Sequence, residues 1–355
     1  MYNRAAVGEH TRVRGALLAV VAAMLLAAWP ARAAAERFEF ALIGDLPYNA
    51  IELALFRDML ASLDGMDLVF VVHDGDLKSA GSPCTDEFLE SRRALLDRSA
   101  HPLVYLFGDN EWTDCHRKSA GGFDPLDRLA RLRALFAQGN ASLGKRRLTL
   151  ERQGAATPEN VRWSHGGVRF IGLHVVGSNN NRGRTKEMDR EYDSRTAANL
   201  AWLRGSFALA REEGAAGVVV LFQGDPRFEL APGSPRRLGF DDTIVALEAE
   251  VVAFDRPTAL VHGDTHRFRI DRPLRDSRSG RTIERFTRVV TFGSPHVRWV
   301  RGTVDQADPA LFRFEAGPER PRPEAGAAGS PAGRPSARPR RRPKRGRRSA
   351  GSMRR

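Results

Sequence analysis

The chain has 355 residues, of which 42% are hydrophobic and 28% are charged, so it can bury a sizeable core and is not a disordered polymer. Its formal net charge of +13 is concentrated at the two ends. Residues 316–355 carry a net charge of +11 and residues 1–33 one of +3, which leaves residues 34–315 nearly neutral at −1. This distribution argues against a globular domain with a basic DNA-binding face, and we expect no specific nucleic-acid binding.

The first 33 residues have the pattern of a cleaved secretory signal peptide. Three arginines precede an apolar stretch from Gly15 to Trp29, and Ala31-Arg32-Ala33 forms an A-x-A cleavage site. An apolar stretch of this length is short for a membrane span, which needs about 20 residues. An uncleaved membrane anchor is the alternative. Both interpretations predict an exported protein, periplasmic or extracellular.

Residues 316–355 predict a disordered tail rich in arginine and proline. They show no apolar periodicity, so they cannot bury enough apolar surface to offset the conformational entropy that folding would cost. Two interpretations remain open. The tail is either a solvated appendage without a partner or a polycation that binds an anionic polymer or a membrane surface.

Cys84 and Cys115 are the two cysteines of the chain. An even pair in an exported protein predicts a disulfide. Such a bridge would close a loop of about 30 residues and contribute roughly 3 kcal/mol in the chain-entropy model. Two separate buried thiols are the alternative.

Residues 34–315 predict one domain in which apolar runs repeatedly end in Gly-Asp. Continuous apolar runs bounded by glycine are typical of buried strands. The runs with their Gly-Asp ends are residues 38–45, 68–76, 103–109, 218–225 and 260–264. Amphipathic stretches predict helices over residues 50–63, 86–99, 125–137, 197–213 and 243–254.

The rest of the domain predicts further strands. Residues 168–176 form one, and residues 285–292, 296–304 and 311–314 are expected to be consecutive antiparallel strands. Because strands and helices alternate through most of the domain, the sequence predicts an α/β (α+β) fold. The expected architecture is a four-layer α/β/β/α sandwich of two mixed sheets with helices outside.

The aspartates that follow the five apolar runs are candidate functional residues. They are Asp45, Asp76, Asp109, Asp225 and Asp264. Ligands of open α/β sheets bind at the carboxyl ends of the strands, so these carboxylates are expected to converge on one crevice. Like charges a few ångströms apart cannot all stay ionised without compensation, which predicts a bound metal. The alternative is that each aspartate caps its own helix.

The order of these motifs resembles that of the calcineurin-like metallophosphoesterases. That family has the motifs D-x-H, G-D-x-x, G-N-H-E, a single His after a strand, and G-H-x-H. The corresponding residues here are 44–48 (GDLPY), 75–78 (GDLK), 108–111 (GDNE), Gln223 and 263–266 (GDTH). The resemblance covers roughly residues 36–305. The string GDNEWTDCH at residues 108–116 is similar to an uncharacterised exported branch.

The resemblance implies one or two divalent metal ions between the sheets. Asp45, Asp76 and His266 match the ligands of the first metal. The family's first histidine is replaced by Pro47, which cannot ligate through its side chain, and the neighbouring Tyr48 could substitute for it.

The second metal implied by the resemblance would share Asp76 with the first. Its other ligands would be Asp109 in place of an asparagine, and Gln223 and Asp264 in place of two histidines. Oxygen donors make a hard site, which favours Mn, Mg or Ca over Zn.

The proton donor departs from the family pattern. Asn110 occupies the position of the histidine that helps to protonate the leaving group, and losing a general acid typically costs 10²–10⁴ in rate. His116 and His73 are candidate replacements, with an ordinary hydrogen-bonded structural histidine as the alternative for each. Good leaving groups would need no acid.

Together with the export signal, the resemblance implies an exported metal-dependent phosphoesterase that hydrolyses a phosphate monoester or diester with metal-activated water. A catalytically degenerate domain that binds a metal or another ligand is the alternative, because three family histidines are lost. The uniform replacement by oxygen donors favours the enzyme. A Cys84–Cys115 bridge would connect the loops that follow Asp76 and Asp109.

Overall fold

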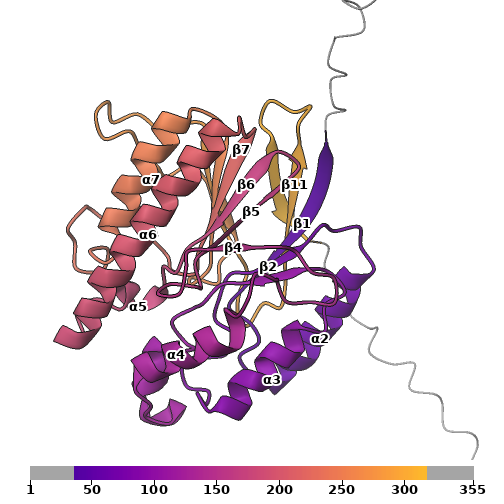
Figure 1. The fold of residues 1–355 in the computed structure, drawn as a ribbon, viewed down its shortest axis with the longest axis vertical. Helices are drawn as coiled ribbons and strands as arrows, with labels where there is room; N and C mark the ends of the chain where they lie inside the picture. Colours follow the sequence, from indigo (N-terminus) through magenta and orange to yellow (C-terminus); the bar gives the residue numbers. More distant parts are fainter. Residues whose placement is uncertain (1–35, 318–355) are drawn as a thin grey trace, which may run out of the picture. The chain divides into compact units, whose positions relative to one another are not determined.

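The structure is a computed structural model that describes residues 36–317 (Figure 1). The predicted signal peptide, residues 1–33, and nearly all of the predicted tail lie outside the described residues. No helix within residues 36–317 combines the length and the apolar character needed to cross a bilayer.

One sheet has five strands in the order β12-β11-β1-β2-β3. The strands β1, β2 and β3 are parallel, whereas β11 and β12 are antiparallel to their neighbours. Their bounds are β1 (Arg37–Ile43), β2 (Val71–His73), β3 (Leu103–Tyr105), β11 (Val300–Asp305) and β12 (Phe312–Ala316).

Three helices pack on the outer face of this sheet, namely α2 (Ala50–Asp64), α3 (Asp86–Leu96) and α4 (Pro125–Phe136) (Figure 1). Each begins within a residue of its predicted position because a capping side chain precedes it. The side chains of Asn49, Thr85 and Asp124 each accept a hydrogen bond from a backbone N–H in the first turn.

The other sheet has seven strands in the order β4-β5-β6-β7-β8-β10-β9. The strands β6, β7, β8 and β10 are parallel to one another, and the pairs β4–β5, β5–β6 and β10–β9 are antiparallel. The bounds are β4 (Glu151–Arg152), β5 (Val161–His165), β6 (Val168–Gly172), β7 (Gly217–Leu221), β8 (Thr258–His262), β9 (Arg269–Asp271) and β10 (Phe286–Val290). Helices α6 (Lys186–Glu212) and α7 (Asp241–Phe254) lie together against its outer face (Figure 1).

The core between the two sheets follows from the period of two along each strand. In β1, Phe38, Phe40 and Leu42 face the other sheet, whereas Ala41 and Ile43 face the helices. Aromatic rings fill much of the space between the sheets; the ring centroid of Phe40 lies 5.5 Å from that of Phe170. The four-layer sandwich of two mixed sheets is therefore confirmed.

Two details of the sequence prediction are wrong. Strand β10 does not join β11 and β12 in an antiparallel meander but pairs in parallel with β8 in the other sheet. Residues 263–285 supply the long crossover that a parallel pair needs. Helix α6 begins at Lys186, eleven residues before the predicted start, because Thr185 caps it and Met188 and Tyr192 continue its buried face. The short strands β4, β5 and β9 were not predicted.

Candidate metal and phosphate site

The loops that carry the predicted ligands meet at the carboxyl ends of the parallel strands. The register pairs the last residues of β1, β2 and β3 with one another, so the segments after these strands lie side by side. Those segments hold Asp45, Asp76 and Asp109. The pairing of β7 with β8 brings the segments that hold Gln223 and Asp264 together in the same way.

A cavity of about 360 Å³ opens where these loops meet. Its lining includes Tyr48, Asp76, Asp109, Asn110, Asp264 and His266. Asp45 lies beside it and is fully buried. One of its oxygens, Oδ2, accepts a hydrogen bond from the backbone N–H of Asp264 at 2.9 Å, and the other, Oδ1, lies 3.6 Å from Nε2 of His266. The structure therefore brings Asp45, Asp76, Asp109 and Asp264 to one place.

The first group of side chains is centred on Asp76. The hydroxyl of Tyr48 donates to Oδ2 of Asp76 at 3.0 Å and lies 3.3 Å from Nε2 of His266. The amide of Asn110 donates to the same Asp76 oxygen at 2.7 Å. Nδ1 of His266 lies 2.7 Å from the carbonyl oxygen of Ser294, which places the ring proton on Nδ1 and leaves Nε2 free to act as a ligand.

The second group consists of Asp109 and Asp264, which crowd over Gly177 in α5 (Gly177–Asn180). A Cβ atom at Gly177 would lie 2.6 Å from Oδ1 of Asp264 and 2.8 Å from Oδ2 of Asp109. Ser178 donates to that Asp109 oxygen at 2.6 Å. A residue without a side chain is therefore required at position 177 for both carboxylates to keep their positions.

Gln223 lies at the predicted strand end, but its amide oxygen is already engaged. Oε1 accepts a hydrogen bond from the backbone N–H of Gly177 at 2.6 Å. Its amide nitrogen is buried without a hydrogen-bond partner. The side chain thus holds the backbone of Gly177, and acting as a metal ligand would require it to release that backbone.

Four of the predicted ligands have left-handed backbone conformations. The φ angles are 50° for Asp45, 59° for Asp76, 70° for Asp264 and 60° for His266. Such angles are uncommon outside glycine and cost energy, and they cluster at functional sites where the surrounding fold holds them in place. The strand ends are therefore shaped to present these four side chains.

The electrostatics of the cluster disfavour several ionised carboxylates. Burial raises the pKa of Asp45, Asp76 and Asp264, and neighbouring carboxylates raise the pKa values of Asp45 and Asp76 further. Burial, followed by the charges of Asp264 and Asp114, raises the pKa of Asp109 to about 7. A cation among these side chains would favour the ionised carboxylates and lower their pKa values.

The donor set fits a divalent ion in its chemistry. Carboxylates, one imidazole and one phenol suit a hard cation, and Oδ1 of Asp45 is buried without a hydrogen-bond partner. Within residues 36–317, however, no three His, Cys, Asp or Glu side chains are arranged so that they could hold a metal ion as they stand. Side-chain movement would be needed to bring the donors around one ion.

Asp74 belongs to this cluster and was missed by the sequence analysis. It is fully buried, and Thr291 donates to its Oδ2 at 2.7 Å. A Cβ atom at Gly44 would lie 1.5 Å from its Oδ1, and one at Gly263 would lie 3.2 Å away. The two glycines of the Gly-Asp motifs thus make room for Asp74. The sequence feature that could have identified Asp74 is its position two residues before Asp76, in the string His-Asp-Gly-Asp.

Three other candidates lie elsewhere. His116 is exposed and does not line the cavity; its ring contacts the carbonyl oxygen of Thr113 and the guanidinium of Arg184. His73 is buried between the carbonyl oxygen of Leu46 and the N–H of Gly75, and burial lowers its pKa to about 4. Asp225 lines a neighbouring cavity instead. Neither histidine is placed to replace the family's proton donor.

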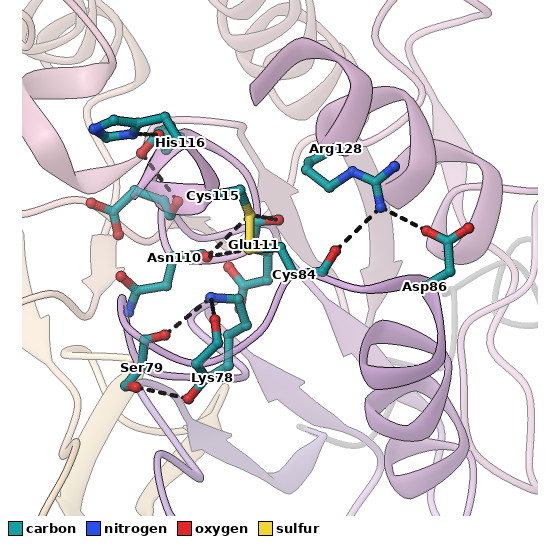
Figure 2. Close-up of a disulfide and its surroundings, with 12 residues drawn as sticks. Lys78, Ser79, Cys84, Asp86, Asn110, Glu111, Cys115, His116 and Arg128 are labelled. Atoms are coloured by element: carbon teal, nitrogen blue, oxygen red, sulfur yellow. Dashed lines mark hydrogen bonds and ion pairs between the residues drawn. A yellow bond between two sulfur atoms is a disulfide. The ribbon is translucent and has the colours of Figure 1, made fainter. Parts of the chain in front are cut away.

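Cys84 and Cys115 form a disulfide in the structure, with their Cα atoms 5.8 Å apart (Figure 2). Both sulfurs lie within 3.9 Å of the carbonyl oxygen of Asn110. On the Asp76 side, the buried Lys78 donates to the carbonyl oxygens of Ser79 and Ser82, both at 3.0 Å. The bridge therefore joins the loop after Asp76 to the turn that carries Asn110, as predicted.

The chain matches no protein-family model and no curated protein sequence. Among solved structures it is similar to a dimetal phosphatase from Danio rerio, with 13% identity, a TM-score of 0.45, and 78% of this chain and 98% of that chain covered. It is similar to PhoD, with 12% identity, a TM-score of 0.49 and coverages of 76% and 64%. It is also similar to the purple acid phosphatase PPD1 from yellow lupin (Lupinus luteus) seeds, with 14% identity, a TM-score of 0.45 and coverages of 79% and 53%.

The chain thus spans about two thirds of the PhoD chain and about half of the PPD1 chain. Two mixed sheets lie face to face, and the loops with residues 44–48, 75–78, 108–111 and 263–266 lie at the carboxyl ends of their parallel strands. The two-sheet architecture that the resemblance to the calcineurin-like metallophosphoesterases implies is therefore present in residues 36–317.

Proposed function

We propose that this protein is an exported, metal-dependent phosphoesterase. The observation that carries the proposal is the convergence of Asp45, Asp76, Asp109 and Asp264 with His266 at one cavity. Buried carboxylates this close together, one of them with an unpartnered oxygen, form an environment that a divalent cation would stabilise.

The residues divide into two ligand groups. Asp45, Asp76, His266 and Tyr48 would hold one ion, and Asp76, Asp109 and Asp264 would hold a second. A bound Mn, Mg or Ca ion would lower the pKa of a water molecule and neutralise charge on a phosphate group. Gln223 would contribute to the second group only after its amide releases Gly177.

Asn110 has a positioning role in this scheme. Its amide nitrogen donates to Oδ2 of Asp76 at 2.7 Å and to the hydroxyl of Tyr48 at 3.1 Å. A carboxamide cannot supply a proton to a leaving group at neutral pH. Because His116 lies outside the cavity, the site favours esters whose leaving groups need no protonation, such as aryl esters.

A second candidate function is a binding module without turnover. The observation in its favour is the loss of the family's leaving-group histidine, since Asn110 stands in its place. Metal binding without hydrolysis is the result expected of such a module.

The export proposal rests on residues 1–33 and on the disulfide. Disulfides such as Cys84–Cys115 form and persist in oxidising compartments. We expect the mature protein to begin at Ala34, which mass spectrometry of the protein recovered from the periplasm or medium would test. A cytoplasmic protein with an intact first residue would contradict export.

The function is tested by measuring metal content and hydrolysis on the same preparation. The protein is purified without chelator, and an activated aryl phosphodiester and the corresponding monoester are supplied with Mn, Mg or Ca. We expect bound metal and turnover in the wild type, and loss of both in Asp76→Asn and Asp264→Asn. Asp127→Asn, on the exposed face of α4, is the matched control.

The possible outcomes separate the two functions. Metal retained without turnover of either ester would favour the binding module. No metal and no turnover would contradict both. Turnover that survives in Asp76→Asn would show that the hydrolysis belongs to another site or to a contaminant.

A further inference from the structure

A second cavity of about 420 Å³ adjoins the candidate metal site. It lies at the carboxyl ends of β8 and β10 and shares Arg227, Arg236 and Asp264 with the lining of the first cavity. The edge of the seven-stranded sheet thus carries two connected hollows. Ligands of such sheets bind along this edge, so one extended ligand can reach both.

The second cavity is rich in arginine, and three of its arginines are paired with carboxylates. Arg288 donates to Asp271 and Glu229, both at 2.6 Å, and Arg227 lies 3.3 Å from Asp225. These ion pairs occupy Asp225 and Glu229, two of the three carboxylates that line the cavity, and the third, Asp264, belongs to the candidate metal site. Five arginines face these three carboxylates, so the lining is not negatively charged.

Two further arginines of the cavity have no such balance. Arg236 and Arg267 are exposed, and within residues 36–317 neither forms an ion pair or a side-chain hydrogen bond. Arg236 lines both cavities. The buried His262 also lines the second cavity, and its Nε2 has no hydrogen-bond partner.

We propose that the second cavity binds a further phosphate group of the substrate through Arg236 and Arg267, so that the substrate class is a phosphoester with at least two phosphates. This inference rests on the proposed function of the first cavity. An unpaired guanidinium offers a planar fork of donors that matches phosphate oxygens. Arg236, which faces both hollows, would lie between the reacting phosphate and the additional one.

The alternative is that Arg236 and Arg267 contact only water. A structural role for the two side chains is disfavoured because they contact no carboxylate. Many other exposed arginines of the domain are paired; Arg272 lies 3.0 Å from Glu284 and Arg313 lies 3.0 Å from Glu315. Arg236 and Arg267 are singled out because they combine the lack of an ion pair with a place in the lining of the second cavity.

The test measures binding rather than turnover. The full-length protein, as purified with its metal, is titrated in a calorimeter with alkanediol bisphosphates of two, four and six carbons. The corresponding alkyl monophosphates are titrated in parallel. We expect at least one bisphosphate to bind about tenfold or more tightly than its monophosphate.

The double variant Arg236→Gln/Arg267→Gln should remove this preference. The single variant Arg267→Gln, which changes a residue of the second cavity alone, should reduce the preference and leave monophosphate binding within about twofold. The matched control Arg272→Gln/Arg313→Gln should keep the preference. These variants change exposed side chains, and circular dichroism verifies their folding. A wild type without preference for any of the three bisphosphates would overturn the inference, as would an unchanged preference in Arg236→Gln/Arg267→Gln.

Failure of the inference and failure of the proposed function give different results. Arginine-dependent preference without hydrolysis of any ester would leave the phosphate subsite standing and remove the enzyme. Hydrolysis of an activated ester without bisphosphate preference would leave the enzyme standing and remove the subsite.

Discussion

The hydroxyl of Tyr48 donates a hydrogen bond to Oδ2 of Asp76 at 3.0 Å and lies 3.3 Å from Nε2 of His266. Tyr48 stands next to the proline that replaces the family's first histidine. Burial and the charges of Asp76, Asp45 and Asp109 raise the pKa of Tyr48, so it is a neutral phenol in this arrangement. It therefore orients Asp76 and His266 and can reach an ion held by them.

Tyr48→Phe should weaken Mn binding by roughly 10–100-fold, the usual effect of removing a group that orients metal ligands. The aromatic ring remains, so the unfolding free energy should change little. Calorimetric titration with Mn measures the affinity, and Tyr192→Phe in α6 is the control. Equal Mn affinity in Tyr48→Phe and wild type would show that the hydroxyl has no part in the site.

Gly177→Ala should disrupt the second ligand group. The added Cβ would meet Oδ1 of Asp264 at 2.6 Å and Oδ2 of Asp109 at 2.8 Å, so both carboxylates must move. We expect at least tenfold weaker Mn binding and a loss of about 1–3 kcal/mol in unfolding free energy from overpacking.

Gly205→Ala in α6 is the matched control for Gly177→Ala. A Cβ there meets nothing closer than 4.0 Å, and alanine is a better helix former than glycine. Its Mn affinity should equal that of the wild type. Wild-type affinity in Gly177→Ala would contradict the placement of Asp109 and Asp264 around a common ion.

The Cys84–Cys115 bridge should stabilise the fold by about 3–4 kcal/mol, because it closes a loop with a sequence separation of 31 residues. Urea unfolding of Cys84→Ser/Cys115→Ser, compared with the wild type, measures this difference. Mn affinity should also fall, since the bridge joins the loop after Asp76 to the turn with Asn110. Reductant should destabilise the wild type and leave the double variant unchanged; equal stability of the two proteins without reductant would refute the prediction.

The buried Glu159 should make the stability of the fold sensitive to acid. Burial alone would raise its pKa, but hydrogen bonds from His174 at 2.8 Å and from Arg133 at 2.6 and 2.9 Å lower it to about 2. Since this folded-state pKa lies below the ordinary value of 4.5, the carboxylate stabilises the fold above pH 4.5. That contribution is lost as the pH falls from about 4.5 to about 2.

Glu159→Gln should therefore lower the unfolding free energy by up to roughly 3 kcal/mol at pH 7, and by less than half as much at pH 3. Urea unfolding at pH 7, 5 and 3 gives the difference from the wild type at each pH. The exposed Glu187→Gln in α6 is the control and should show no such trend. A difference between Glu159→Gln and wild type that stays constant with pH would contradict the assigned pKa.

Much of the fold could be predicted because the local signals agree with the tertiary structure. The alternation of Phe38, Phe40 and Leu42 with Ala41 and Ile43 places β1 between two apolar layers. The partner of β10 could not be predicted in this way. Its apolar pattern fits either sheet equally well, and only the crossover through residues 263–285 decides that it joins β8.

The sequence by itself determined the chemistry of the candidate site. Gly-Asp at the end of each strand predicted carboxylates at one sheet edge, and Asp45, Asp76, Asp109 and Asp264 do meet there. The alternation of strands and helices favours parallel neighbours, and side chains at equivalent ends of parallel strands lie at the same edge of the sheet.

Only the tertiary structure decided which polar groups complete the cluster. Asp74 enters it because Gly44 and Gly263, from two different sheets, leave space for its carboxylate. Asp225 is different, because its side chain pairs with Arg227, only two residues further along the chain, and lines the second cavity. The place of Asp74 depends on residues separated from it by tens to hundreds of positions in the chain, and no local pattern of residues encodes the space that such distant neighbours leave.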